Sequence, residues 1–218
     1  MYLDPLRLAI ALGPLAVYLL VLGVVNLSSR PLVTTGARDT AALGVAVGGL
    51  AIVGPMELFF PENAAVHLGG WVWLVLLAFY ALCVTLLILL MRPRLVIYNV
   101  TCDQLRPILA EVVTDLDRQA RWVGDSLILP ALQVQLYLEP FGAMKTIQLV
   151  SAGPRQSHGG WRRLERALAP ALQQLRGTPN PYGLSLILFG LAMMVLVAVA
   201  VLDNPQAVAL QWQEMLRR

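Results

Sequence analysis

Four apolar runs, each long enough to cross a lipid bilayer as a helix, constrain this chain more than any other feature. They cover about residues 8–27, 40–60, 71–91 and 182–202. The hydrocarbon core of a bilayer requires about 20 mostly apolar residues in a helix. Only 13% of the 218 residues are charged, whereas average soluble domains carry about 25%. The sequence therefore predicts a multi-span membrane protein with four transmembrane α-helices.

The first apolar run, Leu8–Leu27, also resembles a signal peptide in its position. It is longer than the apolar core of most signal peptides, Asp4 precedes it, and no A-x-A cleavage site follows it. We therefore expect this run to be retained as the first span, with cleavage as the alternative.

One long polar stretch, residues 92–177, interrupts the apolar pattern. It divides the chain into a membrane region with three spans at residues 1–91, a water-facing domain at 92–177, and a final segment at 178–218. The final segment carries the fourth span and then a short amphipathic helix. Asn204 and Pro205 are residue types that suit the start of that helix.

The polar stretch has the sequence patterns of a small α+β domain. Its expected elements are a strand at Arg94–Val100, a helix after Thr101, a hairpin around Gly124, strands at Leu132–Glu139 and Met144–Ala152, and a helix at Trp161–Arg176. The order β-α-β-β-β-β-α predicts a mostly antiparallel sheet with both helices on one face.

The segment Leu132–Glu139 shows the clearest alternation of apolar and polar residues in the chain. Such alternation is typical of a strand with one dry and one wet face. The wet face is a candidate surface for a protein partner, and we assign to it Gln133, Gln135 and Tyr137.

The basic residues near the ends of the spans predict the orientation in the membrane. Arg30 and Arg38 lie in the first loop, and Arg92 and Arg94 open the polar stretch, whereas the second loop, 61–70, has no Lys or Arg. Cytoplasmic loops carry the excess of Lys and Arg. We therefore expect a multi-pass protein of the cell membrane with residues 92–177 in the cytoplasm and both termini outside.

The densest basic cluster lies where the last helix of the polar stretch should begin. It contains Arg155, His158, Arg162, Arg163 and Arg166. A helix start beside an anionic membrane can bind a lipid head group, so the cluster is a candidate site for anions or lipid. An ordinary solvated helix face with the usual cytoplasmic positive charge is the alternative. Nucleic acid is not expected as a partner, because no aromatic stacking platform accompanies the charges.

Two features of the second span are candidates for packing or function. Gly44 and Gly48 form a G-x-x-x-G pair, which lets another helix approach closely, either within the chain or in a homodimer. Glu57 is ionisable and follows Pro55 near the end of the span. It is either solvated at the membrane interface or part of an ion path.

The sequence does not indicate a catalytic, metal or cofactor site. His67 and His158 fall on opposite sides of the predicted membrane, and Cys83 and Cys102 are separated by its boundary. Glu111 and Asp115 lie four residues apart and are expected to form a solvated helix face. We therefore assign no catalytic residue, no metal ligand and no cofactor.

The function that this pattern favours is a non-catalytic scaffold or sensor in the membrane, whose cytoplasmic domain binds a protein partner or anionic lipid. One alternative is a subunit of a transporter or channel-like complex that uses the Gly-rich second span and Glu57. Another is a membrane-bound enzyme that acts at the inner lipid surface through His158 and the neighbouring arginines.

The predicted orientation can be tested with a topology reporter. A reporter inserted in the second loop, 61–70, should be active only outside the cell membrane. The same reporter inserted between residues 153 and 160 should be active only in the cytoplasm. The reverse pattern would overturn the orientation.

Overall fold

The structure is a computed structural model, and it describes residues 4–142, 145–154, 156–175, 177 and 179–217. The chain forms two compact units. The helical unit comprises Met1–Leu22, Ala41–Leu90 and Ser185–Arg218, and the sheet unit comprises Gly23–Thr40 and Met91–Leu184.

The described residues include four helices that are long and apolar enough to cross a membrane. They are α1 (Pro5–Leu27), α2 (Gly36–Ala51), α4 (Trp71–Leu90) and α7 (Tyr182–Asp203). A π-helical turn, η1 (Ile52–Met56), extends α2. The helical unit also contains the short helix α3 (Glu62–Leu68) and the C-terminal helix α8 (Pro205–Arg217). The prediction of four long apolar helices is therefore confirmed.

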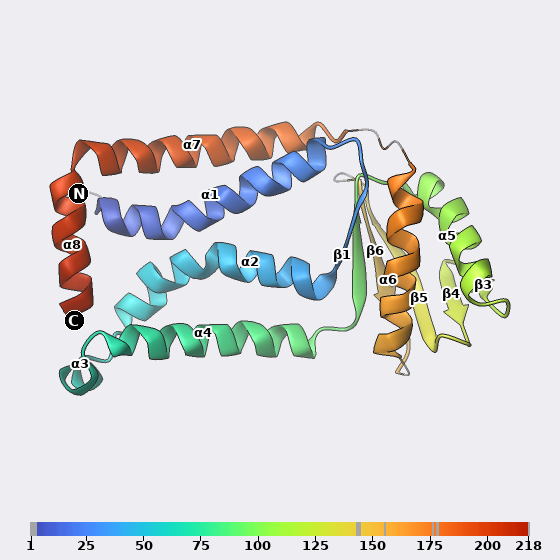
Figure 1. Cartoon of the computed structure of the whole chain (residues 1–218), viewed down its shortest axis with the longest axis horizontal. Coiled ribbons are helices and arrows are strands. Elements are labelled where there is room, and N and C mark those ends of the chain that lie inside the picture. Colours follow the sequence, from blue (N-terminus) through green and yellow to red (C-terminus); the bar gives the residue numbers. More distant parts are fainter. Residues whose placement is uncertain (1–3, 143–144, 155, 176, 178, 218) are drawn as a thin grey trace. The chain divides into compact units, whose positions relative to one another are not determined.

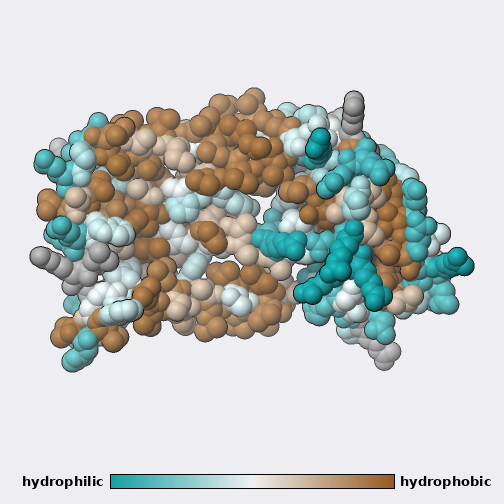
Figure 2. Space-filling model, in the orientation of Figure 1, coloured by the Kyte–Doolittle hydropathy of each residue, from teal (hydrophilic) through white to brown (hydrophobic). Residues whose placement is uncertain are grey.

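The outer surface of the long helices is apolar. Large side chains such as Val21, Leu90 and Phe189 are 58%, 74% and 62% exposed, and the long helices appear mostly brown in Figure 2. An apolar surface that covers several long helices is unusual on a monomeric soluble protein.

Glycines bring three of these helices close together. A Cβ on Gly44 would lie 2.8 Å from the side chain of Val84, and one on Gly48 would lie 3.5 Å from the ring of Tyr80. The Tyr80 hydroxyl also donates a 2.6 Å hydrogen bond to the carbonyl of Gly44. Gly49 makes the tightest approach, because a Cβ there would collide with the backbone carbonyl oxygen of Ile10 in α1.

The sheet unit contains six strands and two helices. The strands are β1 (Leu32–Thr35), β2 (Arg94–Tyr98), β3 (Arg121–Val123), β4 (Ser126–Leu129), β5 (Val134–Phe141) and β6 (Thr146–Ser151), and the helices are α5 (Cys102–Leu116) and α6 (His158–Gln173). The strand order is β1-β2-β6-β5-β4-β3, and all neighbours are antiparallel. From β2 to α6 the elements follow the predicted order β-α-β-β-β-β-α.

One hydrophobic core joins the sheet to both helices. The strands contribute alternate residues, as on Leu132–Leu138, and the helices contribute residues three or four apart. Fully buried members include Leu95, Ile97, Leu105, Leu109, Leu136, Leu149, Leu164 and Leu168. Because α5 and α6 share this core with the same set of strand residues, both helices cover one face of the sheet.

The sheet contains a strand that was not predicted. The segment 28–39 was expected to be a loop, but Leu32–Thr35 forms β1 and pairs with β2 from Leu32 opposite Tyr98 to Thr35 opposite Leu95. The sheet unit therefore begins before residue 92 and includes a segment that lies between the first two spans. Four residues are too few to show a period-2 pattern, and their pairing partner lies about 60 positions away in the sequence.

Two predicted boundaries were wrong. The strand predicted at Leu132–Glu139 was expected to end before Pro140, but β5 continues through Pro140 and Phe141, with Pro140 opposite Ile147. A proline can occupy a strand where its missing N–H group is not needed. Helix α6 begins at His158 instead of Trp161, because the Ser157 side chain accepts a 3.3 Å hydrogen bond from the backbone N–H of Gly160 and caps the helix earlier.

Buried asparagines hold together the ends of α1 and α7 that belong to the sheet unit. Asn99, just after β2, donates from its side-chain amide to the carbonyl oxygens of Val25 and Ser28. The backbone N–H of Asn180 donates a 2.9 Å hydrogen bond to the carbonyl of Asn26. Both amide side chains and that of Asn26 are almost completely buried.

Because Gly49 lies so close to α1, we expect the stability of the helical unit to fall when a side chain is added at this position. Gly49→Ala should destabilise the helical unit by about 1–3 kcal/mol, because overpacking forces helices apart. Gly13→Ala is the matched control, since a Cβ on Gly13 meets nothing within 4 Å. Thermal unfolding of the full chain in detergent measures both effects, and equal midpoints for the two variants would contradict the contact.

Candidate binding groove on the helix layer

An open groove of about 600 Å³ runs between α5 and α6. Helix α5 lines it with Ile108, Glu111, Val112, Asp115 and Leu116, and α6 lines it with Ala167, Pro170, Ala171, Gln174 and Leu175. The groove lies entirely within the sheet unit.

The sequences of the two helices explain why a groove forms there. Each helix turns one apolar stripe, including Leu109 and Leu168, into the core. The neighbouring stripe on α6 carries the small side chains of Ala167 and Ala171. Such small side chains fill the space between two helices poorly, so the surface is hollow. Apolar side chains, including half-buried Ile108, form part of the groove lining.

The α5 wall of the groove is acidic. Glu111 and Asp115 lie one helical turn apart, and both side chains are exposed. Neither carboxylate takes part in an ion pair among the described residues, where the four ion pairs involve other acids.

The α6 side is basic along the same helix face. Arg163 lies one turn before Ala167, and Arg166 lies one turn before Pro170, so both arginines continue the rows of residues that line the groove. Both are exposed, as are His158 and Arg162. Figure 2 shows hydrophilic side chains gathered over this helix.

The single acid of α6 does not neutralise these arginines. Glu165 forms a 2.8 Å ion pair with Arg38, a residue at the start of α2 that belongs to the sheet unit. His158, Arg162, Arg163 and Arg166 are absent from the ion pairs of the described residues. Arg155, the remaining member of the predicted cluster, lies outside the described residues.

The predicted partner face around β5 is partly occupied by the chain itself. Gln133 is exposed, but it lies in the turn before β5 with a φ of 51°. The backbone carbonyl of Gln135 accepts a 3.0 Å hydrogen bond from the side chain of Gln156. Tyr137 is half-buried. Gln135 is exposed like Gln133, and the assignment of these three residues to a partner face stays a prediction.

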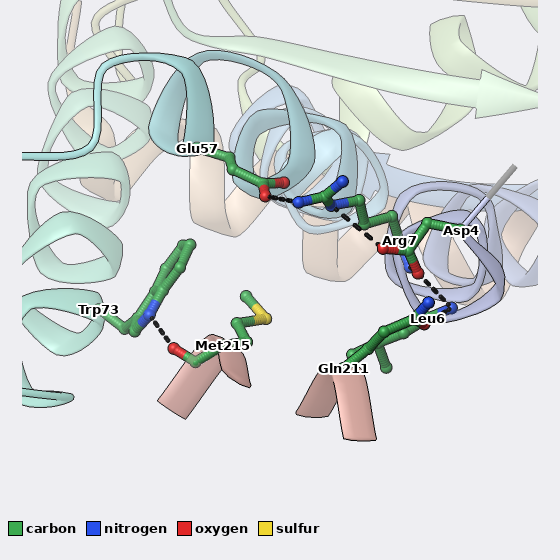
Figure 3. A network of polar contacts seen from close by, with 7 residues as sticks. All are labelled: Asp4, Leu6, Arg7, Glu57, Trp73, Gln211 and Met215. Atoms are coloured by element: carbon green, nitrogen blue, oxygen red, sulfur yellow. Dashed lines mark hydrogen bonds and ion pairs between the residues drawn. The ribbon is translucent and has the colours of Figure 1, made fainter. Parts of the chain in front are cut away.

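Glu57 lies in a polar network in the helical unit, which Figure 3 shows from close by. Its carboxylate pairs with Arg7, which also contacts Asp4. A small cavity of about 40 Å³ adjoins the pair. Arg7 is in the first turn of α1 and Glu57 directly follows η1, so both groups lie at helix ends.

The same network attaches the C-terminal helix. The indole N–H of Trp73 donates a 2.8 Å hydrogen bond to the carbonyl of Met215 in α8, and the backbone N–H of Leu6 donates to the side chain of Gln211 at 3.4 Å. Among the described residues, no group of three or more His, Cys, Asp or Glu side chains could hold a metal ion. The geometry is that of a polar junction between helices.

No protein-family model, curated protein or solved structure matches the chain. The groove is therefore interpreted from its chemistry. It combines an apolar lining with acids on one helix and bases on the other, and none of these charged groups is in an ion pair among the described residues.

The sequence did not predict this groove. Glu111 and Asp115 were interpreted as a solvated face, and the arginines as a separate cluster. One sequence pattern could have indicated the groove. On α6 a small or apolar residue follows each base by one turn: Ala167 follows Arg163, and Pro170 follows Arg166. The pairing of α5 with α6, which brings the two charge types to one groove, depends on the tertiary fold.

The ion pair in the helical unit predicts a small coupling free energy. Its two side chains are 48% and 23% exposed, so the pair should contribute at most about 1 kcal/mol. Arg7→Gln should cost slightly more than Glu57→Gln, because Arg7 also contacts Asp4 at 3.4 Å.

Thermal unfolding of the two single variants and the double variant measures this coupling. The double variant should be no less stable than Arg7→Gln alone. Strictly additive losses would show that Arg7 and Glu57 do not interact.

Proposed function

We propose that this chain is a multi-span protein of the cell membrane, with both termini outside, whose sheet unit is a cytoplasmic, non-catalytic module that docks a protein partner in the α5–α6 groove. The observation that carries this proposal is the groove itself, which has an apolar lining and unpaired charges of both signs beside it.

The membrane part of the proposal rests on the long helices. Their exposed apolar side chains suit contact with lipid, and a helix satisfies its own backbone hydrogen bonds there. The orientation rests on Arg30, Arg38, Arg92 and Arg94, which flank the spans on the side of the sheet unit.

Charge favours a protein partner over an anionic lipid surface. Basic residues near an anionic membrane contribute about 1 kcal/mol each, which would favour contact through Arg163 and Arg166. Glu111 and Asp115, exposed beside the same groove, would be repelled by that surface. A protein surface can place charges of opposite sign against both groups.

The other two predicted functions have less support. A transport role for Glu57 requires a continuous polar path, whereas the Glu57 carboxylate pairs with Arg7 beside a cavity of only about 40 Å³. A lipid-directed enzyme requires groups that converge with His158, and this side chain lies exposed on an arginine-rich face.

A photo-crosslinking side chain at Gln174 tests the docking function in native membranes. Gln174 is exposed and lines the groove, and Gln119 is an exposed control outside it. Ultraviolet light should give a discrete protein adduct from position 174 and none from position 119. The adduct should be lost from the variant E111Q/D115N, which removes the acidic wall.

Three outcomes would contradict the proposal. They are the absence of an adduct at position 174, an adduct that survives E111Q/D115N unchanged, and an adduct of lipid alone. The last outcome would favour lipid binding by the basic residues of α6.

A further inference from the structure

We infer that the occupant of the α5–α6 groove is a second copy of this chain, so that the sheet units form a symmetric dimer through their helix layers. This inference rests on the proposed docking function and names its partner.

The two charged patches have the same size and opposite sign. The acidic patch is Glu111 and Asp115 on α5, and the basic patch is Arg163 and Arg166 on α6. All four side chains are exposed, and none is in an ion pair among the described residues. Each patch therefore keeps its full capacity to pair with another surface.

A two-fold axis makes this surface complementary to itself. In a dimer with two-fold symmetry the same patch is used by both copies, so that if residue i contacts residue j, then j contacts i. An axis that passes between the acidic and basic patches places the acids of each copy against the bases of the other. Both patches are then used twice, and the apolar linings of the two grooves meet between them.

An occupant that carries charge of only one sign would satisfy only half of this surface. A basic amphipathic helix would pair with Glu111 and Asp115 but would be repelled by Arg163 and Arg166. An acidic segment would have the opposite preference. A second copy of this chain carries charges that match both patches, so no like charges oppose its binding.

Confinement to one membrane assists this contact. Copies inserted with the same orientation present their sheet units on the same side, which raises the effective concentration of one groove for another. A groove of modest size with exposed ion pairs is then sufficient for association, although each exposed pair contributes only about 0.2–1 kcal/mol.

Charge exchange between the two patches gives a decisive test on the full chain in a nonionic detergent. The variant E111R/D115R has two basic patches, and the variant R163E/R166E has two acidic patches. Light scattering coupled to size-exclusion chromatography measures the mass of the protein component. The natural chain should be a dimer, and each variant alone should dissociate at least on the order of 100-fold more readily, because like charges then face each other.

An equimolar mixture of the two variants should recover the dimer, because every acidic patch again faces a basic patch. The variant that carries all four substitutions should also be a dimer on its own. The control R118E/R121E reverses two exposed charges that do not line the groove, and it should stay dimeric. Raising the salt concentration should weaken the natural dimer, because salt screens exposed ion pairs.

A monomeric natural chain, a variant whose dimer is unaffected, or a mixture that fails to recover the dimer would overturn the inference. The crosslinker at Gln174 separates this failure from failure of the docking function. An adduct with the mass of two copies supports the dimer. An adduct with a different protein leaves docking intact and removes the second copy as occupant, and the absence of any protein adduct removes both.

Discussion

The architecture depends on how the chain satisfies its backbone polar groups where it passes between apolar helices and the sheet. Buried backbone N–H and C=O groups require partners. In the sheet unit, the amide of Asn99 bonds the carbonyls of Val25 and Ser28 at the end of α1, and Asn180 bonds Asn26 before α7. Asn99 has a φ of 60°, a conformation that asparagine tolerates better than most residues. These bonds connect the end of α1 to the segment that follows β2 and to the segment that precedes α7.

The parts of the fold that follow from local periodicity could be predicted from the sequence. The four apolar helices and the alternation from Leu132 to Leu138 depend on residues close together in the chain. Strand β1 could not be predicted, because Leu32–Thr35 is recognisable as a strand only from its pairing with β2. In the helical unit, the G-x-x-x-G spacing predicted close helix packing at Gly44 and Gly48. The closest approach to another helix's backbone is instead at Gly49, next to the carbonyl of Ile10.

The charged residues of the candidate site could be predicted from the sequence, but the groove that brings them together could not. The sequence identified the arginines of α6 and noted the acids of α5. It could not show that both helices cover the same face of the sheet with a hollow between them. The small side chains of Ala167 and Ala171 line that hollow, and Glu165, the one acid of α6, pairs with Arg38 and not with the bases of its own helix.

The position of β1 in the chain has a consequence for biosynthesis. This edge strand is made directly after the first long helix, whereas its partner β2 follows the third. During translation β1 must stay unpaired while α2 and α4 are synthesised, because domains form as their segments emerge. Two apolar helices thus separate a strand from its neighbour in the same sheet. The sheet can close its edge only after both of these helices have been made.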